Sequence, residues 1–453
     1  MNDADRIRFL RRSPHPALLA SAIATLLVAS GLAASPTAID PPAAAGSFGL
    51  ELVEDDGAVI ATWIEPREGA AAIRFSRFDP AGKGSWSAPR TVAERKDLFA
   101  NWADRPAVRR VADGSLLAHE LRKIAEGTYA YGVRLSRSTD EGATWTDLGW
   151  LHDDTRSVEH GFVSMLTEGD DTLAVWLDGR EMPEQAAGDG HGHGHGHEAA
   201  GGAMTLRTAI LPGKGPAPKA ESPKGPATSR GLDGRVCECC ATDVAMTDRG
   251  PVVVYRDRGP NEERDISIVR RDQGRWTAPA PVSSDGWIMP GCPVNGPSIA
   301  ADGSKVCVVW FTAAVGDLDD PSPPRTLAAR SPDGGATFGS AVELSATTIG
   351  RTDVVMLPSG DAVACWVDRL DPPIAGESPM DRRTDRGSIA LRRIRADGSL
   401  GETLLAAPMH PGRLAGVPRL ASLGGDGTEP RLLLSWRDED SDRLRAMVLR
   451  PPQ

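Results

Sequence analysis

The amino-acid sequence predicts an all-β protein, a β-propeller of four-stranded blades, with seven as the preferred number of blades and six as the alternative. Three observations support this prediction. A unit of two apolar strands around a short turn recurs along the chain of 453 residues, and nearly every copy ends at an aromatic residue. In addition, 49 glycines and 36 prolines suit many short strands joined by turns and argue against long helices.

The repeated unit has an apolar strand, a turn containing Asp or Gly, and a second apolar strand that ends at an anchor residue. Its copies span residues 50–65, 105–120, 161–178, 242–257, 296–311, 352–368 and 418–438. The anchors are Trp63, His119, Trp176, Tyr255, Trp310, Trp366 and Trp436. Regular recurrence is typical of repeat architectures, whereas a pair of β-sandwiches would explain neither the spacing nor the number of copies.

A third strand follows each copy, as at residues 72–79 and 131–140, and a fourth follows in most units, as at 85–92 and 275–282. Four antiparallel strands in roughly 55 residues are typical of one propeller blade. The seventh unit lacks a fourth strand. We expect residues Ala43 to Phe48 to supply it, because closing the ring removes a free sheet edge.

The N-terminus has the pattern of a secretory signal. Arginines between Arg6 and Arg12 precede an apolar run at 17–34 and a stretch rich in Pro and Ala. We expect cleavage around Ala33 to Ala38. An uncleaved membrane anchor is the alternative, although the run is only marginally long enough to span a bilayer. The expected domains are a signal peptide at 1–34, a Pro/Ala-rich linker at 35–46 and the propeller at 47–453.

The compartment and the partners follow from these features. No other long apolar run exists, so no membrane span is expected after cleavage, and the mature protein should be periplasmic or extracellular. Disulfides form in that environment. A net charge of −11 and a pI near 5.4 argue against nucleic acid and anionic membranes as partners.

A sharper motif follows the third strand in two units. The pattern S-x-D-x-G-x-T-W contains Ser138, Asp140, Gly142 and Trp145, and a copy with Phe for Trp contains Ser331, Asp333, Gly335 and Phe338. This pattern resembles the Asp-box, the bacterial-neuraminidase repeat of propellers in the sialidase superfamily. The resemblance covers essentially the whole mature chain as a fold. It implies a structural role, in which the Asp caps a turn and the aromatic ring packs between sheets.

The resemblance is closest at residues 105–122. Arg105 and Pro106 precede a D-G-S-L-L-A turn and strand, and E-x-R follows at Glu120 and Arg122. Sialidases have a similar series. The resemblance implies that Arg105 is the first of three arginines that hold a substrate carboxylate, since its planar guanidinium binds carboxylates in a bidentate manner. An exo-sialidase-type glycoside hydrolase acting on acidic sugars is therefore one candidate.

Acidic residues follow most anchors and form a second candidate set. Some stand close to an arginine, as Asp178 does to Arg180 and Asp257 does to Arg258. A repeated acid–Arg pair is either a structural ion pair between blades or part of a catalytic site. The candidate catalytic residues, for a glycosidase that uses two carboxylates, are Arg105, Glu120, Asp178, Arg180 and Asp257.

Three of the six cysteines fall in the segment VCECCATDV at residues 236–244. The strand order puts this segment just before the innermost strand of the fourth unit. Cys237 and Cys292 stand at the same offset before the anchors of adjacent units. We therefore expect four cysteines to converge on one face of the propeller, namely Cys237, Cys239, Cys240 and Cys292.

Two interpretations of this cluster remain open. One is a disulfide, from Cys237 or Cys240 to Cys292, which the compartment favours. The other is a thiolate site for copper or zinc, and the two could coexist. Cys307 and Cys365 lie inside second strands and are expected to be buried core thiols.

Histidines are expected on the same face. His160 precedes the first strand of the third unit, and an insert at 183–202 contains GDGHGHGHGHE. Residues two apart in an extended chain point the same way, so the four imidazoles can line one side. The insert is either a disordered polar loop or a collector of metal ions. Its candidate ligands are His191, His193, His195 and His197.

The sequence thus predicts an exported sialidase-like propeller whose Cys/His-rich face binds a small ligand or a metal ion. An exo-sialidase-type hydrolase is one alternative. A non-catalytic propeller, held by disulfides and bound to another envelope protein, is the other. The expected partners are a small molecule, a glycan or a metal ion, with copper or zinc as the candidate metals.

Overall fold

The computed structural model describes residues 36–81, 84–184, 202–213, 229–313, 323–370, 386–424 and 430–453. The chain divides into two units, Met1–Ala34 and Ser35–Gln453, and every described residue belongs to the second. The predicted signal peptide and the four histidines of the insert lie outside the described residues. Among the described residues, no helix is long and apolar enough to cross a membrane.

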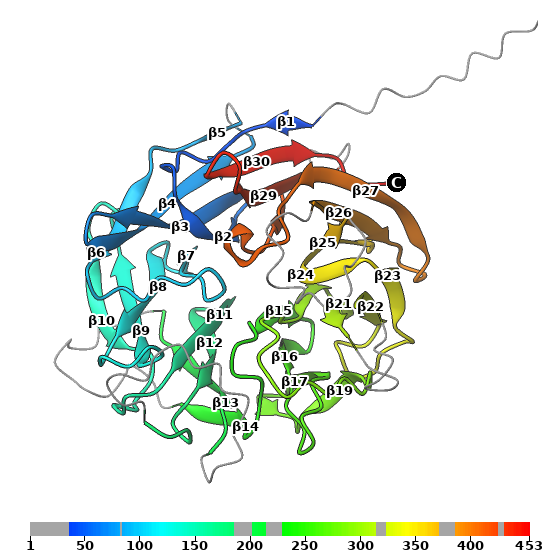
Figure 1. Ribbon diagram of the computed structural model, residues 1–453, viewed down its shortest axis with the longest axis horizontal. Coiled ribbons are helices and arrows are strands. Elements are labelled where there is room, and N and C mark those ends of the chain that lie inside the picture. Colours follow the sequence, from blue (N-terminus) through cyan, green and yellow to red (C-terminus); the bar gives the residue numbers. More distant parts are fainter. Residues whose placement is uncertain are drawn as a thin grey trace, which may run out of the picture. The chain divides into compact units, whose positions relative to one another are not determined.

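The second unit is a β-propeller of seven antiparallel blades, so the predicted fold class and the preferred number of blades are confirmed. Figure 1 shows the sheets arranged in a ring, with the first strands β2, β7, β11, β15 and β24 nearest its centre. The only helical segment in the described part of the chain is the short 3-10 turn η1 (Arg413–Ala415).

The first three blades follow one another along the chain. Blade 1 contains β2 (Phe48–Asp55), β3 (Ala58–Arg67), β4 (Ala70–Asp79) and an outer strand in two pieces, β5 (Ser85–Trp86) and β6 (Arg90–Arg95). Blade 2 contains β7 (Ala107–Arg110), β8 (Leu116–Lys123), β9 (Tyr131–Ser138) and β10 (Thr146–Trp150). Blade 3 contains β11 (His160–Glu168), β12 (Asp171–Asp178), β13 (Thr205–Leu211) and β14 (Arg230–Asp233).

The next three blades repeat this order. Blade 4 contains β15 (Asp243–Thr247), β16 (Gly250–Arg256), β17 (Ile266–Asp272) and an outer strand in two pieces, β18 (Arg275–Trp276) and β19 (Ala280–Ser283). Blade 5 contains β20 (Ser298–Asp302), β21 (Lys305–Thr312), β22 (Arg325–Ser331) and β23 (Val342–Ser345). Blade 6 contains β24 (Thr348–Met356), β25 (Ala362–Arg369), β26 (Gly387–Ile394) and β27 (Leu400–Pro408).

Blade 7 joins the two ends of the propeller. It contains β28 (Arg419–Ser422), β29 (Leu432–Asp438), β30 (Arg443–Leu449) and, as its outer strand, β1 (Thr37–Ala38). In Figure 1, β1 lies beside β30, and Thr37 pairs with Val448. An N-terminal strand thus closes the ring as predicted, but the expected segment was wrong. Residues Ala43 to Phe48 instead lead into β2, and Phe48 is its first residue.

The anchor residues form the cores between neighbouring sheets. Trp63, Trp176, Trp310 and Trp366 are completely buried. The indole N–H of Trp176 donates to Asp178 at 2.8 Å, and that of Trp366 donates to Asp368 at 2.7 Å. Buried indole groups usually have such a partner. In these two strands, the acid two residues after the anchor is therefore a hydrogen-bond acceptor for the Trp of its own strand.

The two S-x-D-x-G-x-T turns lie between the third and fourth strands of blades 2 and 5, as predicted. In blade 2, the Ser138 hydroxyl donates to Asp140 at 2.8 Å and accepts from the N–H of Gly142 at 2.7 Å. Asp140 also accepts from the backbone and the hydroxyl of Thr144. The turn that starts at Ser331 repeats all of these bonds. These side chains fix the shape of a turn and lie away from the cavity described below.

Candidate functional site

A central cavity of about 710 Å³ opens among the first strands of the blades. Its wall combines apolar and aromatic groups, such as Trp102 and Phe162, with charged side chains such as Arg105 and Asp243. A cavity of this size, with polar groups among apolar ones, is typical of a small-molecule site.

Four charged residues of this cavity occupy one register position in different blades. Glu51, Asp243, Asp353 and Arg419 are each paired across the sheet with the residue immediately before the anchor of their blade. The first strand faces the channel in every blade, so equivalent positions meet around the axis. The repeat therefore brings three carboxyl groups and one guanidinium group to the same cavity.

Arginines bind two of these carboxylates. Arg419 contacts Glu51 at 2.5 Å and Asp353 at 3.3 Å, and Arg105 contacts Glu51 at 2.7 Å. Burial acts to raise the pKa of Glu51, but Arg419 and Arg105 outweigh it and lower the pKa. Burial raises the pKa of Asp353, and that of Asp243 to about 7. Arg105, the arginine singled out in the sequence, thus lines the cavity but is already bound to a carboxylate.

Two other arginines line the cavity without an ion pair among the described residues. Arg109 makes one long hydrogen bond, 3.5 Å, to the Thr167 hydroxyl. Arg351 donates to backbone carbonyls, including that of Gly412 at 2.7 Å, and its guanidinium lies 5.2 Å from the centre of the Trp102 ring. Burial lowers the pKa of both arginines to about 10, so both remain cationic at neutral pH. Within the described part of the chain, the cavity is therefore lined by two positive charges that form no direct ion pair.

The backbone is strained at three points of the cavity wall. Phe162, Val294 and Arg351 have φ angles of 52°, 50° and 60°, which are uncommon for residues other than glycine. Phe162 and Arg351 lie within the first strands β11 and β24, Val294 lies in the segment that leads into β20, and all three line the cavity. Irregular register accompanies the strain in β11 and β24. Strained backbone and bulges gather at functional sites more often than elsewhere, which favours the cavity as the site.

A buried Tyr lies between two carboxyl groups at the edge of the cavity. The Tyr131 hydroxyl is 3.1 Å from Asp104 Oδ2 and 2.6 Å from Glu159 Oε1. A hydroxyl has one proton to donate, so a second proton on one carboxyl group is needed to satisfy both contacts. Burial raises the pKa of Asp104 to about 7 and that of Glu159 to about 8. The site therefore holds a carboxylic acid proton near neutral pH.

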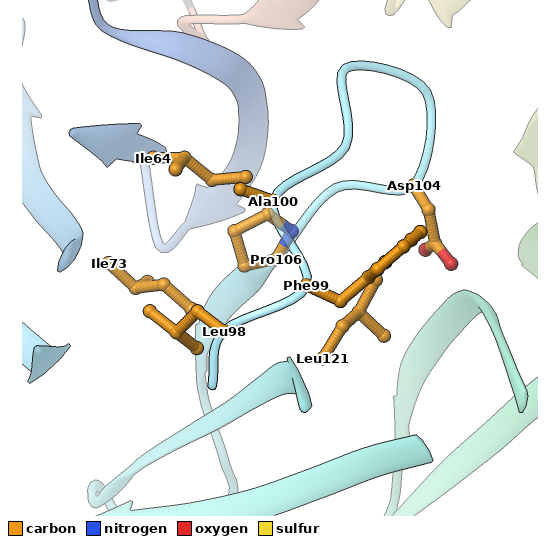
Figure 2. A pocket seen from close by; sticks show the side chains of 8 residues that line it. All are labelled: Ile64, Ile73, Leu98, Phe99, Ala100, Asp104, Pro106 and Leu121. Atoms are coloured by element: carbon orange, nitrogen blue, oxygen red, sulfur yellow. The ribbon is translucent and has the colours of Figure 1, made fainter. Parts of the chain in front are cut away.

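Asp104 also borders a second, very small cavity of about 10 Å³. Figure 2 shows its carboxyl group turned away from the apolar side chains of Ile64, Ile73 and Leu98. Asp104 is the only charged residue among the eight that line this space. Burial of the Asp104 carboxyl group is the main reason why its charged form is disfavoured.

The cysteine segment converges as predicted, but the expected pairing was wrong. Cys239 forms a disulfide with Cys292, whereas Cys237 and Cys240 are free and buried. The N–H of Cys237 donates to the carbonyl of Arg256, which ties the backbone of Cys237 to the second strand of blade 4. Cys239 is half-buried and lines the central cavity. The disulfide links the segments that lead into blades 4 and 5. Cys307 and Cys365 are buried core thiols, as predicted.

His160 lies apart from the cysteine group and contacts two acids. Its Nδ1 is 3.2 Å from Asp178 and its Nε2 is 3.5 Å from Asp154. Burial acts to lower the pKa of His160, but the two carboxylates outweigh it and raise the pKa. Asp178 also binds Arg180 at 2.7 Å. These residues do not line the central cavity.

The other acid candidates also lie outside the cavity lining. Glu120 is buried and contacts Arg122, and burial is the main cause of its raised pKa. Asp257 accepts from Ser267 at 3.1 Å, while Arg258 pairs with Glu238 and Glu262 instead of with Asp257. Of the candidate site residues selected from the sequence, Arg105 and Cys239 line the cavity, and the rest of its wall comes from residues that the sequence pattern did not select as candidates.

The sequence patterns did not single out Glu51, Asp104, Arg109, Tyr131 or Arg419. The signal that could have found three of the four register-equivalent residues is a charge inside an otherwise apolar first strand, as in LELVED, TDVAM and TDVVM. A charge at the channel-facing position of several repeats is unusual for a core strand.

Comparisons with known proteins were made at three levels. No family model matches the sequence, and no curated protein matches it significantly. Three similar solved structures illustrate the structural matches. A protein of unknown function from Dyadobacter fermentans has a TM-score of 0.48 and 11% identity, over 92% of this chain and 98% of that chain.

The other two are sialidases. The sialidase of Trypanosoma rangeli has a TM-score of 0.42 and 12% identity, and the match covers 82% of this chain and 56% of that chain. The NanB sialidase of Streptococcus pneumoniae has a TM-score of 0.41 and 11% identity, over 91% of this chain and 69% of that chain.

Proposed function

We propose that this propeller binds a small molecule with a carboxylate group, of the acidic-sugar type, in its central cavity. The observation that carries the proposal is the pair Arg109 and Arg351, which line the cavity without an ion pair among the described residues. A buried charge is costly unless it is paired, so an anionic ligand would supply what these arginines lack. A guanidinium group binds a carboxylate through two parallel hydrogen bonds.

Other groups of the wall suit the rest of such a ligand. Trp102 offers an aromatic face to a ring, and Phe162 extends the apolar surface. With a pKa near 7, Asp243 is partly protonated at neutral pH and can donate to a ligand hydroxyl as well as accept from one. The acids of the cavity discourage a ligand with several negative charges, which favours a single carboxylate.

Titration calorimetry with N-acetylneuraminate and glucuronate tests this proposal. We expect Arg109→Ala and Arg351→Ala each to weaken binding at least tenfold, because a hydrogen bond to a charged group contributes about 1.5–3 kcal/mol. Arg110→Ala is the matched control. It follows Arg109 in β7 but pairs with Asp55 and Glu141 outside the cavity. Equal loss in the control, or no binding of either sugar acid by the wild type, would contradict the proposal.

A second candidate function is hydrolysis of an acidic glycoside, and Asp104 is the observation that favours it. A carboxyl group with a pKa near 7 at a cavity edge suits a general acid, which protonates the leaving oxygen. Among the residues that the structure describes, its Oδ1 has no hydrogen-bond partner. On a fluorogenic sialoside we expect turnover that declines above about pH 7 and is lost in Asp104→Asn. Absence of turnover across pH 4 to 8 would exclude the hydrolase and leave the binding proposal standing.

We further propose that the protein acts outside the cytoplasm. The secretory pattern of the N-terminus supports export, and the Cys239–Cys292 disulfide suits an oxidising compartment. The disulfide also supports the third possibility raised by the sequence, a propeller that binds another envelope protein, but no surface of the described residues singles out such a partner.

A further inference from the structure

A second cluster, independent of the proposed ligand, lies where the chain enters blade 4. The sulfur atoms of Cys237, Cys239 and Cys240 lie within 4.8 Å of one another. The disulfide to Cys292 occupies Cys239, so it leaves Cys237 and Cys240 as two neighbouring thiols. Each of these two residues is only 1% exposed. The fold therefore holds two soft donor atoms together in a dry place.

The charge around the two thiols is unusual. Arg256 is almost completely buried, and its guanidinium donates to three backbone carbonyls, those of Asn295, Phe311 and Arg264. Within the described residues it forms no ion pair with a carboxylate. Arg256 interacts electrostatically with Cys240 and Cys237, and also with Asp285 and Asp265. A buried guanidinium without an ion-pair partner favours negative charge beside it, which a thiolate can supply.

The second buried arginine, Arg264, lies near Cys237 but is also paired with two acids. Arg264 contacts Glu238 at 3.1 Å and Glu262 at 2.7 Å. Arg258 pairs with the same two acids. This network holds Glu238, the residue between Cys237 and Cys239, as an ion-pair partner and not as a ligand for a metal. Only the two thiols remain as donors of the cluster.

The number of thiolates and the buried positive charge of Arg256 together indicate which metal ion the cluster would bind. Soft thiolates bind Cu(I) and zinc, but zinc sites in proteins use four ligands, or three with an open position. Two thiolates and one Cu(I) carry a net charge of −1, which Arg256 would neutralise. Two thiolates and Zn²⁺ are neutral and would leave Arg256 uncompensated. Both the ligand number and the charge thus favour a monovalent soft ion.

We propose that Cys237 and Cys240 form a binding site for one Cu(I) ion. On binding, both thiols lose their protons, two S–Cu bonds form, and the oxidation state of copper and sulfur does not change. Cys239 provides the approach, because it lines the central cavity and its sulfur lies within 4.8 Å of both thiol sulfurs. The site differs from the cavity site in residues and in ligand chemistry.

The test is anaerobic competition of the full, disulfide-intact protein with a coloured cuprous chelator. We expect one Cu(I) per chain to resist the chelator, with release of about two protons per ion at neutral pH. Cys237→Ser and Cys240→Ser should each lower the affinity at least a hundredfold. Cys307→Ser and Cys365→Ser are matched controls, since both remove a buried free thiol elsewhere, and they should retain the ion.

Three results would overturn the proposal. They are the absence of chelator-resistant copper, equal loss in all four variants, and a second disulfide between Cys237 and Cys240 in the purified protein. If the two test variants fail to fold, copper-edge X-ray absorption of the loaded wild type decides the matter. Sulfur neighbours alone are expected, and nitrogen neighbours would place the ion on histidines instead. Loss of copper binding would leave the sugar-acid titration unaffected, so the two proposals can fail separately.

Discussion

Arg419→Ala is expected to lower the free energy of unfolding by about 3–5 kcal/mol, because it leaves the buried carboxyl group of Asp353 without its ion-pair partner and leaves Glu51 with Arg105 alone. Arg419 contacts Glu51 and Asp353, and its own side chain is 15% exposed. Those two acids come from blades 1 and 6, on either side of blade 7. The substitution therefore removes an ionic link among three blades at once. Urea denaturation at neutral pH measures the effect.

Two further variants make this prediction specific. Adding Glu51→Gln and Asp353→Asn to Arg419→Ala should recover part of the loss, because amides carry no charge that needs a partner. Arg445→Ala is the control, since its ion pairs with Asp40 and Asp438 lie near the surface. Exposed pairs contribute at most about 1 kcal/mol. A cost for Arg419→Ala as small as that of the control would show that the network contributes little.

The buried carboxyl group of Asp104 should make stability depend on pH, and this is the second large effect. Its pKa is raised from 3.8 to about 7, mainly by burial. The folded state therefore binds a proton that the unfolded state has released between about pH 4 and pH 7. The stabilisation that protonated Asp104 gives the folded state is complete below the pKa of Asp104 in the unfolded chain. It is lost as the pH rises through about 7. A shift of this size corresponds to roughly 4 kcal/mol.

In the wild type, the proton on Asp104 makes the free energy of unfolding fall by about 1.4 kcal/mol per pH unit between pH 4 and pH 7. We expect Asp104→Asn to remove this contribution to the pH dependence. The variant should gain relative to the wild type as the pH rises. Asp333→Asn is the control, because the pKa of that carboxyl group is lowered to about 2 and its effect falls at lower pH. Denaturation curves at four pH values suffice, and parallel profiles for wild type and Asp104→Asn would refute the prediction.

The propeller could be predicted because its strongest signal is repetition. One apolar strand–turn–strand pattern, with a Trp at the end, specifies how each blade packs on the next. The closing strand was misplaced because Thr37–Ala38 has only two residues and no apolar alternation. The segment Thr37–Ala38 pairs with β30 because β30 offers a free sheet edge, and its own sequence has no pattern that indicates the pairing.

The candidate site was predicted less well, for reasons that concern side-chain direction. The shared offset of Cys237 and Cys292 correctly indicated that the two segments are neighbours. It did not show that Cys239, and not Cys237, forms the disulfide, while the backbone N–H of Cys237 donates to the carbonyl of Arg256. The sequence made the carboxylate of Asp178 a catalytic candidate because Arg180 is near it. In the structure, the indole of Trp176 and the ring of His160 also contact this carboxylate. Such partners are visible only once the sheets are packed.

The pairing of β1 with β30 has a consequence for the order of events when the chain is made. The ribosome makes the chain from the N-terminus, so Thr37 is made long before its pairing partner Val448. Blades 1 to 6 use strands that are close neighbours in the chain and can form as they emerge. The first strand, β1, can pair only after β30, the last strand, has been made. A chain that stops before Arg443 would therefore have most of its blades but remain an open ring.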